Sequence, residues 1–76
     1  MEKEERYEVL GEIANNAEGE TIKGSDIASI VGLSGRALFS AIAAAYRYFY
    51  KKGDGDTAEN IARTFVDEDG NYAYCK

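Results

Sequence analysis

The chain has 76 residues, a formal net charge of −5 and a hydrophobic content of 45%. This length predicts one domain, residues 1–76, and the apolar content is that of a folding chain rather than a disordered one. No apolar run approaches the roughly 20 residues that a transmembrane helix needs, and the start MEKEERYE is too charged for a signal peptide. We therefore expect a cytoplasmic protein with no membrane partner.

Few residues in this sequence are suited to catalysis or metal binding. There is no histidine, and the one cysteine, Cys75, has no second thiol with which to form a disulfide or hold zinc. We expect it to be a plain reduced thiol. The sequence has no Gly-rich phosphate loop before a helix, and its acids fall in turns or on an exposed helix face. We predict that the protein is not an enzyme and uses no cofactor or metal.

Charge is distributed unevenly along the chain. Residues 1–26 sum to −5, residues 27–53 carry four basic residues and no acid, and residues 54–76 sum to −4. Phosphate contacts supply much of the affinity for nucleic acid, so the net acidity argues against a nucleic-acid binder. The basic middle segment, in contrast, has the positive charge that a small DNA-binding surface needs.

Residues from about 2 to 17 are predicted to form the first helix, followed by a short extended piece at residues 20–23. On one side of this helix, residues that form a largely apolar face recur at three- and four-residue intervals: Arg6, Tyr7, Leu10, Ile13, Ala14 and Ala17. The other side is acidic: Glu2, Glu4, Glu5, Glu8 and Glu12. An ordinary solvated face is the favoured interpretation of these acids, with partner binding or phosphate mimicry as the alternative.

Residues from about 25 to 51 predict two helices joined by a tight turn. Ser25 is a suitable N-cap for the first helix, with Asp26 in its first turn. Gly32 is placed to end that helix in a left-handed conformation. Leu33 can fill the corner between the helices, and Ser34 can then cap the second one.

The segment SDIASIVGLSGRAL resembles the helix-turn-helix of prokaryotic DNA-binding proteins, and above all the winged helix domains of phage and mobile-element regulators. Ala28 is small where the helices would cross, Gly32 follows four residues later at the turn, and Leu38 and Ile42 face inward. The resemblance implies an α+β fold, a winged helix-turn-helix with a three-helix core and a C-terminal β-hairpin wing. It also implies a small transcriptional or mobile-element regulator that binds DNA.

The second helix of this motif, at about residues 35–51, has two distinct sides. At 100° per residue, one side is an apolar core stripe: Leu38, Ile42, Ala45, Tyr46 and Phe49. The opposite side carries Arg36, Ser40, Ala43, Arg47 and Lys51. Arginine can pair bidentately with guanine or clamp phosphate, and small residues let the backbone approach the groove floor. An ordinary basic solvated face is the alternative, and the preceding turn favours DNA.

Four aromatic residues near the end of this helix allow two interpretations. Tyr46, Tyr48, Phe49 and Tyr50 could form a stacking platform for single-stranded nucleic acid. Tyr46 and Phe49 already have core positions, however, so packing is the favoured interpretation. Tyr48 and Tyr50 are expected at the edges of the core stripe, against the wing or a second subunit.

The C-terminal third is ambiguous between helix and strand. Asp56 and Glu59 form a capping-box-like pair, and the apolar residues Ala58, Ile61, Ala62 and Phe65 would suit a two-turn helix. Alternatively, residues 61–66 form a strand paired with residues 71–75 across an Asp-Gly turn. Partly from the family, we predict a helical turn at about 57–60 and a wing hairpin at about 61–75. The hairpin's tip carries three acids, which departs from wings that grip the DNA backbone.

Together these features predict a sequence-specific double-stranded DNA-binding protein. The helix from Gly35 would enter the major groove, with the following contacts expected: Arg36 and Ser40 near base edges, Arg47, Lys51 and Lys52 near phosphates, and Arg63 on the wing. So few basic residues in one module imply a homodimer on a two-fold site, or a larger assembly. The alternative is an acidic winged helix module or phage- or plasmid-type inhibitor that binds a protein partner, suggested by the −9 outside residues 27–53.

Overall fold

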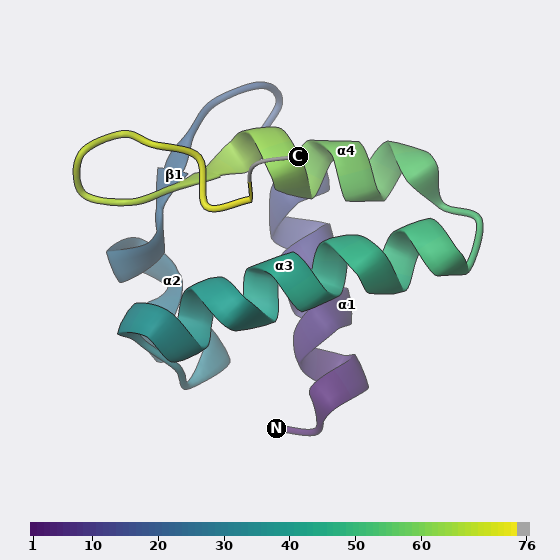
Figure 1. Ribbon diagram of the computed structural model, residues 1–76, viewed down its shortest axis with the longest axis horizontal. Helices are drawn as coiled ribbons and strands as arrows, with labels where there is room; N and C mark the ends of the chain where they lie inside the picture. The colour runs from purple at the N-terminus through teal and green to yellow at the C-terminus, as the bar shows by residue number, and fades with distance from the viewer. Residues whose placement is uncertain (75–76) are drawn as a thin grey trace.

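Four helices and a small parallel sheet make up residues 1–74, the part of the chain that the computed structural model describes (Figure 1). Their order is α1 (Lys3–Asn16), β1 (Ile22–Lys23), α2 (Gly24–Val31), α3 (Gly35–Lys51), α4 (Gly55–Thr64) and β2 (Phe65–Val66). The predicted α+β class is confirmed at this level. Cys75, predicted as a reduced thiol, lies outside the described residues.

The core is built around α3, on which α1, α2 and α4 all pack (Figure 1). The inward side of α3 is buried as predicted: Leu38, Ile42, Ala45, Tyr46 and Phe49. These side chains meet Leu10 of α1, Val31 of α2, Ile61 of α4 and Phe65 of β2 in one cluster. Each helix thus buries one apolar stripe, which is why the three- and four-residue spacing in the sequence was informative.

The first helix, and the two following helices with a tight turn between them, agree with the sequence prediction in their approximate bounds. The glutamates predicted on the solvent side of α1 are all exposed. Between α2 and α3, Gly32 has a φ of 76°, the left-handed conformation that glycine adopts without steric cost. Leu33 packs partly buried against the core. The two helices are bent by 84° relative to each other across the turn.

None of the helices in residues 1–74 is by itself long and apolar enough to cross a bilayer, and α2 and α3 meet that test only as a bent pair.

The prediction that Ser25 caps α2 is wrong. Lys23 occupies the N-cap position without a side-chain cap hydrogen bond, and the Ser25 hydroxyl donates to Oε2 of Glu68 at 2.6 Å. The cap moves two residues earlier because β1 runs directly into the helix at Gly24, which lies against the ring of Phe39. Ser34 does hold the N-cap position of α3, but its side chain makes no cap hydrogen bond.

The predicted wing hairpin at residues 61–75 is wrong in its first half, because residues 61–64 belong to α4. The helix buries one stripe consisting of Thr57, Ala58, Ile61 and Thr64. Its cap is Asp54 rather than Asp56: the Asp54 carboxylate accepts from the Thr57 N–H at 3.1 Å and from the Thr57 hydroxyl at 2.8 Å. The cap and this buried stripe outweigh the strand preference of Thr64, and the core therefore has four helices rather than three.

What remains of the hairpin is a tight acidic turn at residues 67–70. β2 pairs with β1 in parallel, with Ile22 opposite Phe65, so residues 20–23 do contribute a strand. The chain then reverses, and Val66 forms a single antiparallel bridge with Tyr72. The Asp67 carboxylate accepts from two backbone N–H groups, those of residues 69 and 71, which shapes the turn and lowers the pKa of Asp67.

The aromatic residues of α3 pack within the fold. The Tyr46 ring stacks on Tyr74 with centroids 4.1 Å apart, and Tyr50 lies 5.5 Å from Tyr46. Tyr48 lies 5.2 Å from the Tyr7 ring of α1, so it contacts α1 rather than the turn that replaces the wing. Packing, rather than a nucleic-acid stacking platform, accounts for the buried Tyr46.

Candidate nucleic-acid interface

One exposed side of α3 carries Arg36, Ser40, Arg47 and Lys51, which we call the basic stripe. It lies opposite the buried core side of the helix. At 1.5 Å per residue, the stripe is about 22 Å long. The major groove is about 12 Å wide, so a helix seated in it can bring one end of the stripe to base edges and the other to phosphates.

The three cations of the basic stripe are free of acidic partners. Among the described residues, no hydrogen bond or salt bridge holds the side chain of Arg36, Arg47 or Lys51. A cation that already bonds a carboxylate must give up that bond before it can bind phosphate. These three side chains carry no such cost, which makes the stripe the available cationic surface of α3.

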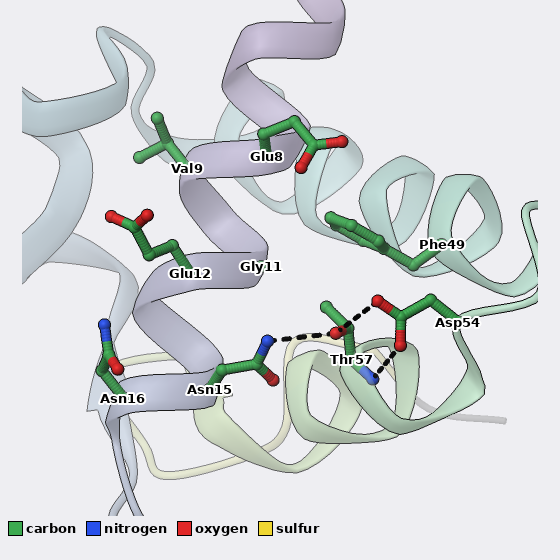
Figure 2. A pocket seen from close by; sticks show the side chains of 9 residues that line it. All are labelled: Glu8, Val9, Gly11, Glu12, Asn15, Asn16, Phe49, Asp54 and Thr57. Carbon is green, nitrogen blue, oxygen red and sulfur yellow. Dashed lines mark hydrogen bonds between the residues drawn. The ribbon is translucent and has the colours of Figure 1, made fainter.

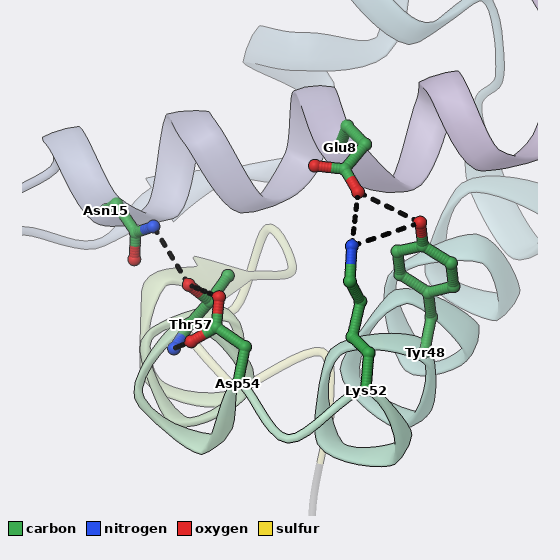
Figure 3. Close-up of polar contacts among 6 residues, drawn as sticks. All are labelled: Glu8, Asn15, Tyr48, Lys52, Asp54 and Thr57. Carbon is green, nitrogen blue, oxygen red and sulfur yellow. Dashed lines mark hydrogen bonds and ion pairs between the residues drawn. The ribbon is translucent and has the colours of Figure 1, made fainter.

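Lys52, also predicted to contact DNA, lies off the stripe and points toward α1 (Figure 3). Its Nζ is 3.0 Å from Oε2 of Glu8 and 3.4 Å from the Tyr48 hydroxyl, which itself donates to Glu8 at 2.9 Å. The hydrogen bonds from Lys52 and Tyr48 lower the pKa of Glu8, and the bond to Glu8 raises the pKa of Lys52. Both side chains are about half exposed, so the pair adds little stability. It does orient the ammonium away from the stripe.

Arg63 comes from a different helix than the stripe. It lies in the last turn of α4, where its guanidinium donates to Oδ1 of Asn60 at 3.1 Å. Asn60 in turn donates to Asn15 of α1 at 2.7 Å. The structure therefore brings together four of the six predicted DNA-contacting residues, and the contacts of Lys52 and Arg63 with DNA stay predictions.

The N-terminal end of α3 combines charges of both signs. No side chain caps the helix and no acid lies in its first turn, so its first N–H groups, at the positive end of the helix dipole, stand beside Arg36. The acidic turn at residues 67–70 lies at the same end of the fold, beside β1 and above α2 in Figure 1. Its carboxylates disfavour phosphate on that side. Anions are therefore favoured along the basic stripe and disfavoured at the turn.

A groove of about 450 Å³ separates α1 from the end of α3 and the start of α4 (Figure 2). Three of its polar side chains are joined by hydrogen bonds: Asn15 Nδ2 donates to the Thr57 hydroxyl at 3.0 Å, and that hydroxyl donates to Asp54 at 2.8 Å. The bonds from Thr57 lower the pKa of Asp54. Residues 1–74 contain no cluster of three or more side chains able to hold a metal ion. This groove is a hydrogen-bonded joint between helices.

No protein-family model matches this chain, and no curated protein or solved structure does. The functional conclusion therefore rests on the geometry of α3.

The sequence pattern predicts the basic stripe but gives no sign of a second groove beside α2. That groove, of about 410 Å³, is lined by residues from α2, from α3 and from the acidic turn. Periodicity reports one helix at a time and cannot bring three segments together.

Proposed function

We propose that this protein binds double-stranded DNA in a sequence-specific manner, with α3 as its recognition helix. One observation carries the proposal: Arg36, Arg47 and Lys51 lie exposed on one side of a helix-turn-helix and have no acidic partner within residues 1–74. A solvated structural face needs no such separation of basic from acidic side chains. The chain as a whole is acidic, so this separation is local to α3.

The two ends of the stripe have different roles in this proposal. Arg36 and Ser40, in the first turns of α3, contact base edges, where arginine can pair with guanine and a hydroxyl can pair with several bases. Arg47 and Lys51 lie about 16 to 22 Å farther along the helix and bind phosphates. Base contacts specify the sequence, and phosphate contacts fix the register of the protein on the duplex.

The fold we propose is a winged helix-turn-helix whose wing is reduced to the acidic turn. The α2–α3 pair supports this assignment, because its three-residue turn contains Gly32 and its 84° bend is close to that of helix-turn-helix motifs. The basic stripe of α3 then supplies the main DNA contacts. A module with three free cations binds weakly, so we propose that two copies act on a two-fold site, as a small transcriptional or mobile-element regulator does.

Site selection from a random duplex pool, followed by single substitutions, tests this assignment. We expect Arg36→Ala to relax the preference at one base position, because a bidentate contact discriminates by about 1–3 kcal/mol. Lys51→Ala should weaken binding to all sequences and reduce the slope of log affinity against log salt by about 0.9. Lys3→Ala on α1 is the control and should change neither quantity. Unchanged binding and preference in both stripe variants would overturn the assignment.

A further inference from the structure

The groove beside α2 has an apolar floor and an acidic rim. The start of α2 and the first turns of α3 form the floor, where the half-buried Ala28 and Phe39 supply the apolar surface and the buried Leu38 lies beneath them. A Cβ added at Gly35, which also lines the groove, would meet nothing within 4 Å, so the groove is open on that side. Its volume of about 410 Å³ falls within the range of ligand sites in proteins, roughly 300–1,000 Å³.

Three carboxylates from the acidic turn, those of Asp67, Glu68 and Asp69, form the rim. Two of them have structural roles: Asp67 shapes the turn, and Glu68 accepts from Ser25 at the start of α2, where the helix dipole favours a carboxylate. Asp69 is exposed, and no hydrogen bond within residues 1–74 holds its side chain. The rim therefore keeps negative charge available to a ligand.

We propose that this groove binds a protein segment in which large apolar side chains are flanked by lysine or arginine. The apolar side chains occupy the volume over Ala28 and Phe39, and the flanking cations pair with Asp69 and with the outer oxygen of Glu68. The same rim repels DNA phosphate and acidic segments. This site is separate from the basic stripe and does not depend on DNA binding.

A second folded copy of residues 1–76 does not supply this segment. Two runs of residues 1–76 have large apolar residues between basic ones with no acid in between: RALFSAIAAAYR at residues 36–47 and RYFYKK at residues 47–52. Leu38 and Ile42 of the first run and Phe49 of the second belong to the core, at 1%, 0% and 4% exposed, so a second copy could present these side chains only by unfolding α3. A different polypeptide that exposes large apolar residues between basic ones supplies both the apolar side chains for the floor and the cations for the rim.

Titration of the ¹⁵N-labelled full chain with the peptide acetyl-KKLFKK-amide tests the proposal. We expect amide shifts concentrated at Gly24, Ala28, Leu38, Phe39 and Asp69. The peptides acetyl-EELFEE-amide and acetyl-KKGSKK-amide, which lack the cations and the apolar pair respectively, should bind more weakly.

Charge-neutralising variants separate the rim from general acidity. Glu68→Gln/Asp69→Asn should weaken the KKLFKK peptide about three- to tenfold, as expected for two exposed ion pairs. Glu4→Gln/Glu5→Gln on α1 makes the same charge change away from the groove and should leave the affinity unchanged. Asp69→Asn alone keeps the Glu68–Ser25 hydrogen bond and serves if the double variant melts early.

Four outcomes would overturn the proposal. They are the absence of shifts, shifts spread equally over the acidic face of α1, equal binding of the KKGSKK peptide, and groove shifts that depend on protein concentration without peptide. The last would identify a second copy as the occupant. None of these results bears on the basic stripe, so DNA binding is judged separately.

Discussion

Gly11 lies where α1 packs against Phe49 of α3. A Cβ built on it would lie 2.6 Å from Cε2 and Cζ of Phe49 and 3.0 Å from Cγ2 of Thr57. Carbon atoms in contact are ordinarily about 3.5–4.0 Å apart, so the ring would have to move by about 1 Å. Phe49 is buried in the core cluster, and this movement must displace its neighbours. Gly11→Ala therefore overpacks the joint between the two helices.

Two opposing effects set the size of this change. Overpacking a core costs about 1–3 kcal/mol, whereas replacing glycine by alanine in a helix interior contributes about 0.5–1 kcal/mol. We expect the free energy of unfolding to fall by up to about 2.5 kcal/mol, with a central value of about 1.2 kcal/mol. In a domain of this size, each kcal/mol shifts the Tm by about 4–8 °C, so the central value lowers the Tm by roughly 5–10 °C.

Urea denaturation followed by circular dichroism measures the effect in two backgrounds. In Phe49→Leu the ring atoms nearest to the new methyl group are gone, so Gly11→Ala should there be neutral or stabilising. Gly55→Ala in the first turn of α4 is the control, because its Cβ meets nothing within 4 Å, and it should not destabilise. Equal effects of Gly11→Ala in both backgrounds, or stabilisation of the wild type, would refute the reasoning.

Two further predictions concern α4. Asp54→Ala should lower the Tm at pH 7 more than Asp56→Ala does, because Asp54 caps the helix with hydrogen bonds whereas Asp56 in the first turn interacts only with the helix dipole. The pKa of Asp54 is lowered, so its stabilising effect is complete above the unfolded pKa of about 4 and is lost as pH falls through the lower folded pKa. Melts at pH 7 and near pH 2 should show the Asp54→Ala difference shrinking with acid, and a pH-independent difference would contradict this. Ile61→Ala should lower the free energy of unfolding by about 2–5 kcal/mol in urea titrations, whereas a surface position in a wing would change it by less than about 0.5.

The parts of the fold that the sequence predicted are those determined by neighbouring residues. The alternation of apolar and acidic side chains defines α1, and Gly32 followed by Leu33 defines the turn of the helix-turn-helix. In each case the signal lies within one or two turns of helix. No distant contact is needed to interpret it.

The prediction for the C-terminal third was wrong because contacts between residues distant in the sequence determine its secondary structure. Thr64, Phe65 and Val66 favour a strand by themselves, yet the burial of Ile61 against α1 and α3 extends the helix to residue 64. Only then does β2 begin, and its partner is β1, more than 40 residues earlier in the chain. The Ser25 prediction failed for a similar reason, because the pairing of β1 fixes where α2 starts.

The candidate site also has a part that the sequence predicts and a part that depends on contacts between distant residues. The basic stripe follows from helical periodicity, and the structure places Arg36, Ser40, Arg47 and Lys51 on one exposed face. The sequence could not show that Lys52 pairs with Glu8, because the two residues are 44 positions apart. The groove beside α2 was hidden for the same reason, since its walls come from segments that only the tertiary fold brings together.

The most direct test of DNA binding is fluorescence anisotropy with a random-sequence duplex at low and near-physiological salt. The wild type is compared with Arg36→Glu/Arg47→Glu and with Lys3→Glu/Lys23→Glu, which makes the same charge change off the stripe. We predict that wild-type binding weakens steeply with salt, that it disappears in Arg36→Glu/Arg47→Glu, and that it persists in the Lys3→Glu/Lys23→Glu control. Absence of binding at low salt, or equal loss in both variants, would contradict this prediction.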